Sequence, residues 1–144
     1  FELSLSYAKR HKYKIAILFI DLDYFKEIND SLGHDIGDRL LVEIGTRLKQ
    51  IIHSNDILIR QGGDEFIMAF TELSSSDEVI EEAQKILITI ARPIKIEAHK
   101  ISITASIGIS IYPKDGQDLN MLIKQADKAL YIAKSAGKNN FKFI

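Results

Sequence analysis

Three carboxylates stand where the sequence predicts the ends of β-strands. Asp21 follows the apolar run IAILFI at residues 15–20, and Asp64 and Glu65 lie in the turn of RQGGDEF. If the strands that carry them are neighbours in one sheet, the carboxylates converge at one end of it and repel one another unless a cation binds. Carboxylate and carbonyl oxygens suit Mg²⁺ or Mn²⁺. A carboxylate-held pair of such metals is a common device for in-line displacement at phosphorus.

The glycines beside these carboxylates fit the same interpretation. Gly62 and Gly63 permit a positive φ, and without side chains they let another molecule approach the backbone closely. Gly and Asp are also common in ordinary hairpin turns, and on the turn alone that simpler interpretation is favoured. Asp21, at the end of a strand that is apolar at every position, shifts the balance toward a metal site.

The segment that starts at Asp21, DLDYFKEINDSL, does not fit an EF-hand calcium loop. Lys26 stands where that loop needs Gly, and Leu32 stands where it needs a bidentate Glu. A helix that begins near Tyr24 would instead direct its free N–H groups toward the metal site, where they can hold phosphate. Lys26 would add a positive charge there, although a lone lysine is more often a solvated surface residue.

The rest of the sequence predicts the elements that position these residues. Apolar residues at helical spacing predict helices at residues 1–12, 36–52, 75–91 and 119–136, and a further helical segment after Tyr24 that is interrupted near Gly33. Strands are expected at residues 15–20, 56–61, 65–71, 101–111 and 141–144, with a short extended segment at 93–97. Strands grouped around a hairpin, with helices between them, indicate an α+β sheet with helices on its faces.

Two of these elements carry more detailed local signals. ISITASIGISI alternates strictly between Ile or Ala and small polar residues, which predicts an antiparallel strand with one buried face. The helix after residue 74 opens with Ser75 and Glu78 at the spacing of a capping box, in which each side chain bonds a backbone N–H.

Composition excludes several classes of protein. The 144 residues fit one domain, and their formal net charge of −1 provides no global basic field to attract nucleic acid. There is no cysteine, so disulfides and thiolate metal sites are excluded, which suits the cytoplasm. No apolar run can span a bilayer, so we expect no direct membrane contact. Because the chain begins at Phe1, we expect it to be one domain of a longer protein, which could itself be membrane-anchored.

Four stretches together resemble the GGDEF domain of diguanylate cyclases: DLDYFKEINDSLGHDIGD, RQGGDEF, SITASIGISIYPKDG and QADKALYIAKSAGKN. The resemblance covers nearly all of residues 1–144 in the family's order and spacing, but a DxLTGLxNR segment that usually precedes this region is missing. It implies a fold like the palm of polymerases and class III nucleotide cyclases, with a ferredoxin-like core. In that fold a mostly antiparallel sheet is flanked by helices, and the signature lies in a β-hairpin turn.

The resemblance also implies a reaction and its partners. Two GTP molecules condense to cyclic di-GMP and two pyrophosphates, with Mg²⁺ or Mn²⁺ as cofactor, two ions per GTP. Each domain holds one GTP, so a second copy of the domain must face the first, and an upstream sensor domain would control the pair. Since no coiled coil is visible, we expect mostly monomer in dilute solution.

Catalytic and metal-binding roles carry over to five positions. The resemblance implies that Asp21 and Asp64 are side-chain metal ligands and that Leu22 offers its backbone carbonyl. Glu65 would help with the metal or with deprotonation of the attacking hydroxyl, and the general base stays open. Lys26 would stabilise charge on the phosphates.

The resemblance implies that GTP is bound by Phe25, Lys26, Asn29, His34, Asp38, Lys134 and Lys138. Asn29 and Asp38 match the pair that reads guanine, although a helix cap is the simpler interpretation of each. Lys134 and Lys138 match two basic residues that reach the phosphates from the last helix. The family often has Arg at the second position, and Lys keeps the charge but loses the bidentate fork.

One motif departs from the family. Many members carry an inhibitory product site, RxxD, before the signature, and here the matching stretch is HSND, His53 to Asp56. Histidine is mostly neutral at pH 7 and has no planar fork for phosphate or guanine. We therefore predict that this site is degenerate and that product inhibition through it is weak or absent.

Other functions compete with the cyclase. A non-catalytic GTP-binding module could regulate an attached domain such as a phosphodiesterase, although the signature of that class is usually degenerate and this one is intact. A scaffold domain without a ligand is disfavoured because the guanine and phosphate positions are filled. Adenylate-cyclase-like chemistry shares the palm, but Asp38 favours guanine.

Overall fold

The computed structural model describes residues 1–144. The helices are α1 (Glu2–His11), α2 (Phe25–Leu32), α3 (His34–Lys49), α4 (Ser76–Ala91) and α5 (Leu119–Ser135). The strands are β1 (Lys14–Leu22), β2 (Ile57–Arg60), β3 (Glu65–Leu73), β4 (Ile94–Ile96), β5 (His99–Ile101), β6 (Ala105–Tyr112) and β7 (Phe141–Phe143). The predicted helices and strands are present with ends that differ by a few residues, except for the strand predicted at 101–111.

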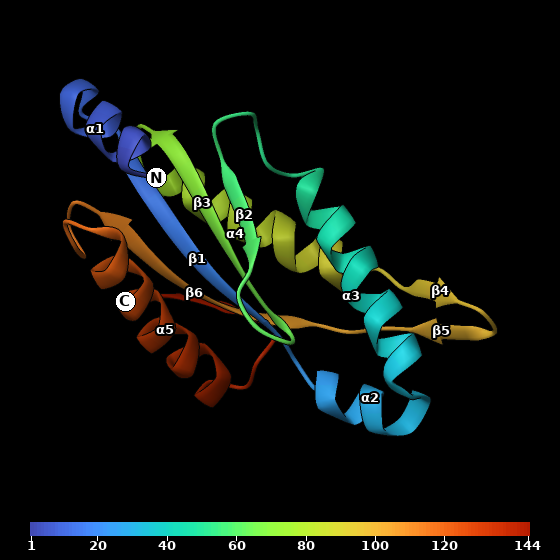
Figure 1. Ribbon diagram of the computed structural model, residues 1–144. Coiled ribbons are helices and arrows are strands. Elements are labelled where there is room, and N and C mark those ends of the chain that lie inside the picture. Colours follow the sequence, from blue (N-terminus) through green and yellow to red (C-terminus); the bar gives the residue numbers. More distant parts are fainter.

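The main sheet has five strands in the order β2-β3-β1-β6-β7. All neighbours are antiparallel except β6 and β7, which run parallel. β4 and β5 form a separate two-stranded hairpin that projects beyond α3 (Figure 1). The predicted α+β class is confirmed, as are the mostly antiparallel sheet and the position of the signature in a hairpin turn.

Helices cover both faces of the sheet, which explains the apolar run in its central strand. Leu18 and Ile20 of β1 belong to a large core under α3 and α4, whereas Ile15, Ile17 and Phe19 belong to a smaller core under α1 and α5. A strand buried on both faces cannot alternate, so β1 is apolar at successive positions. Its first polar residue toward the signature is Asp21, at the end of the strand.

The prediction of one long strand at 101–111 with one buried face was wrong. β5 ends at Ile101 and β6 begins at Ala105, and all eight residues of β6 are buried. The small residues on the second face let α5 approach: a Cβ added to Gly108 would collide with the backbone of α5. Ser106 and Ser110 keep their hydroxyls hydrogen-bonded, so this polar face can be covered without cost from unpaired groups.

The starts of two helices also differ from the prediction. Ser75 is the N-cap of α4, but its side chain makes no capping hydrogen bond, so the predicted capping box is wrong. Ser74 Oγ instead donates to Glu78 Oε1 at 2.5 Å. α3 begins at His34 and not at residue 36, because Gly33, with φ of 95°, allows a sharp junction directly after α2.

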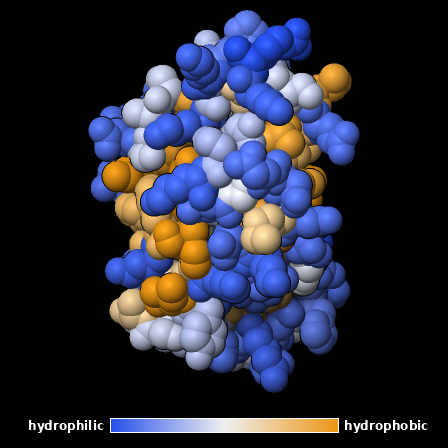
Figure 2. All heavy atoms as spheres, turned by 90° about the vertical axis from the view of Figure 1, so that its left-hand side faces the viewer, coloured by the Kyte–Doolittle hydropathy of each residue, from blue (hydrophilic) through white to orange (hydrophobic).

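The face that carries α1 and α5 is mainly hydrophilic, with apolar side chains at the surface in several places (Figure 2). Among the helices of the molecule, none has the length and hydrophobicity needed to cross a membrane.

Candidate active site

The pairing of β1 with β3 brings the predicted carboxylates together. Asp21 lies opposite Glu65 in the register, and the Leu22 N–H donates to the Asp64 carbonyl at 3.1 Å. Since β1 ends where the hairpin between β2 and β3 turns, three carboxylates from two distant segments share one end of the sheet. This juxtaposition is the one that the sequence predicted.

The turn itself is held by the arginine that precedes it. Arg60 Nε donates to the carbonyls of Gly62 and Gly63 at 3.1 and 3.2 Å, and its Nη2 donates to Gly63 at 3.0 Å. Neither glycine has a positive φ, so the turn does not use that freedom. At Gly63 a Cβ would meet nothing within 4 Å, which leaves the backbone there open to an approaching molecule.

Mutual repulsion and burial perturb two of the carboxylates. Burial raises the pKa of Asp21 to about 6, the charge of Asp64 adds to this, and Lys134 partly offsets it. Burial also raises the pKa of Glu65, together with the charges of Asp64 and Asp127. A bound cation would relieve this repulsion, so the donor set fits a hard divalent ion.

No group of three or more His, Cys, Asp or Glu side chains is arranged to hold a metal ion. Asp21, Asp64 and Glu65, the three predicted side-chain ligands, therefore do not form a ready-made metal cage. Mg²⁺ is commonly held by one or two carboxylates, with the remaining positions filled by water and substrate phosphates. The predicted ligands include a backbone carbonyl, that of Leu22, and so do not require a cage of side chains.

Lys134 extends from α5 to the carboxylates. Its Nζ lies 3.3 Å from Asp21 Oδ2 and 3.8 Å from Asp23 Oδ1, and its side chain is 30% exposed. Lys134 is therefore not an ordinary solvated surface lysine. A phosphate entering here would find this ammonium group already beside the carboxylates.

Sequence reasoning assigned no role to Asp23. This residue is 1% exposed, and its carboxylate accepts hydrogen bonds from Thr104 Oγ1 and Ser106 Oγ, both at 2.7 Å, and from the Asn139 N–H at 3.0 Å. A signal was present in DLD, because an acidic residue two positions after Asp21, at the end of a buried strand, requires partners. Those partners are remote in the sequence and could not be named.

The predicted phosphate-binding residues at the start of α2 lie near the turn that follows the last helix. α2 begins at Phe25, which is buried, and no side chain caps its N-terminus. Lys26 is exposed in the first turn. Lys138 Nζ lies 4.0 Å from the centre of the Tyr24 ring, directly before the helix. Lys138 therefore lies next to the start of α2, where helix N–H groups without a side-chain cap can bind anions.

The simpler interpretations of the guanine pair are excluded by the helix boundaries. Asn29 lies inside α2 and Asp38 inside α3, whose N-cap is Gly33, so neither side chain is a cap. Asn29 Oδ1 is buried without a hydrogen-bond partner, and a Cβ on Gly37 would collide with it. The amide therefore packs against Gly37 with its acceptor oxygen unpaired. His34, at the start of α3, and Asp38 are exposed.

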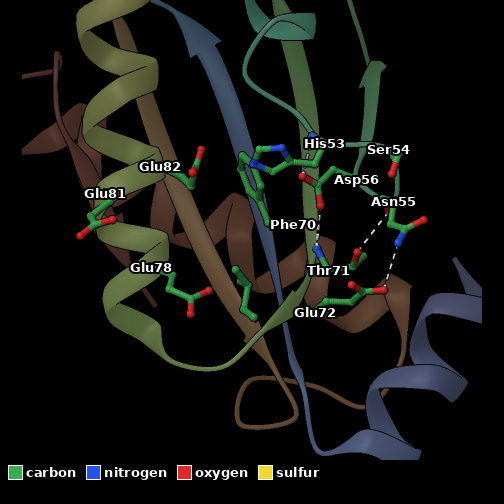
Figure 3. Close-up of a pocket in the computed structure, with 11 residues that line it drawn as sticks. His53, Ser54, Asn55, Asp56, Phe70, Thr71, Glu72, Glu78, Glu81 and Glu82 are labelled. Atoms are coloured by element: carbon green, nitrogen blue, oxygen red, sulfur yellow. Dashed lines mark hydrogen bonds between the residues drawn. The ribbon is translucent and has the colours of Figure 1, made fainter.

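His53 and Asp56 lie away from this site, at the other end of β3. Asp56 accepts hydrogen bonds from the N–H groups of His53 at 2.9 Å and Thr71 at 3.0 Å. Both residues line a cavity of about 390 Å³ whose wall includes Glu72, Glu78, Glu81 and Glu82 (Figure 3). Figure 3 shows α4 with its glutamates across the cavity from the loop of His53.

Comparisons with known proteins agree on the family. A sequence model described as diguanylate cyclase, GGDEF domain, matches residues 1–140. The chain is 39% identical over 143 residues to the bifunctional diguanylate cyclase/cyclic di-GMP phosphodiesterase MucR of Pseudomonas aeruginosa, covering 99% of this chain and 21% of MucR. It is also 39% identical over 130 residues to the cyclic di-GMP phosphodiesterase NbdA of the same organism, covering 90% of this chain and 16% of NbdA.

The structure is similar to solved GGDEF domains. The crystal structure of the GGDEF domain of TpbB from Pseudomonas aeruginosa has a TM-score of 0.94 and 36% identity, and the match covers 98% of this chain and 88% of that chain. This likeness confirms the predicted palm-like fold. The chain spans about a fifth or less of the length of MucR and NbdA.

Proposed function

The chain belongs to the GGDEF domain family, whose relatives include diguanylate cyclases, and we propose that it is itself a diguanylate cyclase. In each of two steps the 3′-hydroxyl oxygen of one GTP attacks the α-phosphorus of the other. The bond to pyrophosphate breaks, and the hydroxyl proton leaves to a base. Two such steps yield cyclic di-GMP and two pyrophosphates.

The observation that supports this most is the convergence of Asp21, Asp64 and Glu65 at one end of the sheet. With the Leu22 carbonyl they would hold Mg²⁺ or Mn²⁺, two ions for each GTP. When bound, such ions polarise the α-phosphate and lower the pKa of the attacking hydroxyl. Alone, the carboxylates would repel the triphosphate, so the substrate is expected to enter with its metal.

Basic residues around this edge would hold the phosphates. Lys134 is already beside Asp21, and Lys138 lies at the start of α2 with the free N–H groups near Phe25. Lys26, in the first turn of α2, adds a further cation. These groups bind and orient the triphosphate so that its α-phosphorus faces the hydroxyl of the second GTP.

Guanine would be read between α2 and α3. The Asp38 carboxylate can accept from guanine N1–H and the exocyclic amine, a pattern that adenine does not present. Asn29 supplies an unpaired buried carbonyl oxygen in the same region, and His34 lies at the junction of the two helices. Competition between GTP and ATP checks this assignment, and tighter binding of ATP would overturn it.

The reaction needs a second copy of the domain, because each copy holds one of the two GTP molecules. We also propose that residues 1–144 act as one domain of a longer signalling protein with an upstream sensor. GTP and Mg²⁺ are supplied in the cytoplasm, where the domain would work.

A non-catalytic GTP-binding module is the second candidate. It is favoured by the identity of 39% to NbdA, which is named as a phosphodiesterase. In such a protein a GGDEF domain could bind GTP and control an attached catalytic domain. All carboxylate positions needed for turnover are filled here, which favours the cyclase.

Incubation with GTP and Mg²⁺ at high protein concentration, with products separated by chromatography, tests the proposal. Cyclic di-GMP from the wild type and not from Asp64→Ala supports the cyclase and the metal site. GTP binding without product, in the fragment and in the longer protein, supports the regulatory module. A wild type that does not bind GTP overturns both.

A further inference from the structure

Asp23 is the only acidic or basic residue among the buried residues of the molecule. Its carboxylate accepts three hydrogen bonds, from the hydroxyls of Thr104 and Ser106 and from the backbone N–H of Asn139. Its own N–H donates to the Thr104 carbonyl at 2.8 Å. A buried carboxylate depends on such donors, and removing either side leaves an unpaired group. Asp23 therefore fixes the segments that supply them.

One of these segments is the turn after α5, whose backbone is unusual. Gly137, Lys138 and Asn139 all have positive φ, at 114°, 65° and 48°. Non-glycine residues in this conformation are strained and persist where surrounding contacts hold them. The bond from Asn139 to Asp23 is one such contact, and the bond from Asn140 Nδ2 to the Lys138 carbonyl at 2.7 Å is another.

Two lysines lie in or near this turn. Lys138 belongs to it and lies over the Tyr24 ring, and Lys134 ends within 3.8 Å of Asp23 itself. Asp23 comes directly before Tyr24 at the exit of β1, so the turn after α5 contacts the two residues that precede α2. Both cations thus lie close to one buried carboxylate.

We propose that Asp23 is a positioning residue for nucleotide phosphates: by holding the turn after α5 it directs Lys134 and Lys138 toward the start of α2. The proposal rests on the proposed binding of GTP at this edge. Asp23 does not need to touch the nucleotide, because it acts through the lysines and through the Asn139 N–H.

The direction in which one substitution changes the affinity for GTP separates this role from a simple effect of charge. Asp23→Asn removes a negative charge near the phosphates, so a purely electrostatic role predicts tighter binding of GTP. An amide has one acceptor oxygen, and its NH₂ group would face donors, so it cannot accept all three hydrogen bonds. Positioning therefore predicts weaker binding.

Calorimetric titration with GTP and Mg²⁺, and separately with guanosine, tests the proposal on the wild type and three variants. Asp23→Asn is expected to weaken the binding of GTP roughly tenfold, which is the effect of losing one hydrogen bond to a charged group. Guanosine, which has no phosphate, is expected to bind unchanged. Ser106→Ala is expected to act in the same direction with a smaller effect.

Ser110→Ala is the matched control. Ser110 is as buried as Ser106, lies on the same strand, and donates a hydrogen bond of the same length, 2.7 Å, to the Leu122 carbonyl. Its loss should lower stability about as much as the loss of Ser106 but leave the affinity for GTP unchanged. The pair therefore separates positioning from general destabilisation.

Unchanged or tighter GTP binding by Asp23→Asn overturns the positioning role and leaves the proposed function intact. Equal losses for GTP and guanosine, or an equal loss in Ser110→Ala, also overturn it. A wild type that binds no GTP overturns the proposed function and this proposal together. If Asp23→Asn does not fold, Ser106→Ala and Thr104→Val decide by the same criteria.

Discussion

The two ends of β3 carry similar carboxylates that the structure uses differently. At the signature end, Asp21 and Asp64 crowd together, and Lys134 from another element approaches them. At the far end, Asp56 is engaged by two backbone N–H groups, and glutamates of α4 line the cavity beside it. Crowded carboxylates with a nearby ammonium group favour a metal and phosphates. A carboxylate already satisfied by the backbone stabilises a loop.

The largest expected effect of a substitution at either end of β3 is on the rate of cyclic di-GMP formation. Asp21→Asn removes one carboxylate from the signature end and should lower cyclic di-GMP formation about a hundredfold or more, the scale of losing a group that stabilises the transition state. Initial rates at saturating GTP measure it. Glu81→Gln, which removes a carboxylate from the far end, serves as control and should retain full activity. Comparable losses in both variants would contradict the contrast.

The next effect is on stability. Asp56→Ala leaves the N–H groups of His53 and Thr71 without their acceptor and should lower the free energy of unfolding by about 2 kcal/mol, as expected for hydrogen bonds to a charged group. Urea unfolding measures the change. Glu81→Ala, at an exposed position of the same cavity, should change it little. If Asp56→Ala is as stable as the wild type, the loop role of Asp56 is wrong.

A smaller effect is expected in the pH dependence of the metal-free domain. The folded pKa of Asp21, about 6, lies above its ordinary value of 3.8, so the folded state binds this proton more tightly than the unfolded state. The stability from Asp21 is therefore present below pH 4 and is lost as pH rises through 6. Contact with solvent keeps the effect modest.

The comparison of wild type with Asp21→Asn isolates this contribution, because the other carboxylates titrate in both proteins. The difference in unfolding free energy, wild type minus variant, should fall between pH 4 and pH 7. A difference that is constant or rises over this range would show that Lys134 dominates the environment of Asp21.

The contrast also shows which parts of the molecule a sequence can predict. The burial of β1 on both faces followed from its apolar run, and the convergence of Asp21 with the signature hairpin followed on the condition that the two strands are neighbours. Both depend on patterns within short segments. The burial of the second face of β6 could not be predicted from the sequence. Ser106, Gly108 and Ser110 are typical of a solvent-facing side until α5 is placed on them.

Asp23 could not be assigned for a related reason. Its partner Asn139 is 116 positions away in the sequence. The hydrogen bond comes from the backbone N–H of Asn139, which the residue type does not predict. The roles of Asn29 and Asp38 in reading guanine stay predictions. What the structure adds is that neither caps a helix and that the Asn29 oxygen has no partner.

The smallest expected effect concerns cyclic di-GMP at the far end of β3. A ligand with two phosphates would meet the cavity wall of glutamates, and His53 offers no guanidinium fork to offset them. Asp56 has both carboxylate oxygens engaged by backbone N–H groups. We therefore expect no binding of cyclic di-GMP in the micromolar range at this cavity and no change in product inhibition on His53→Ala. Calorimetric titration measures the first and progress curves the second. Micromolar or tighter binding that is lost on His53→Ala would overturn this prediction and make both ends of β3 binding sites, since the histidine would then engage the product despite the surrounding acids.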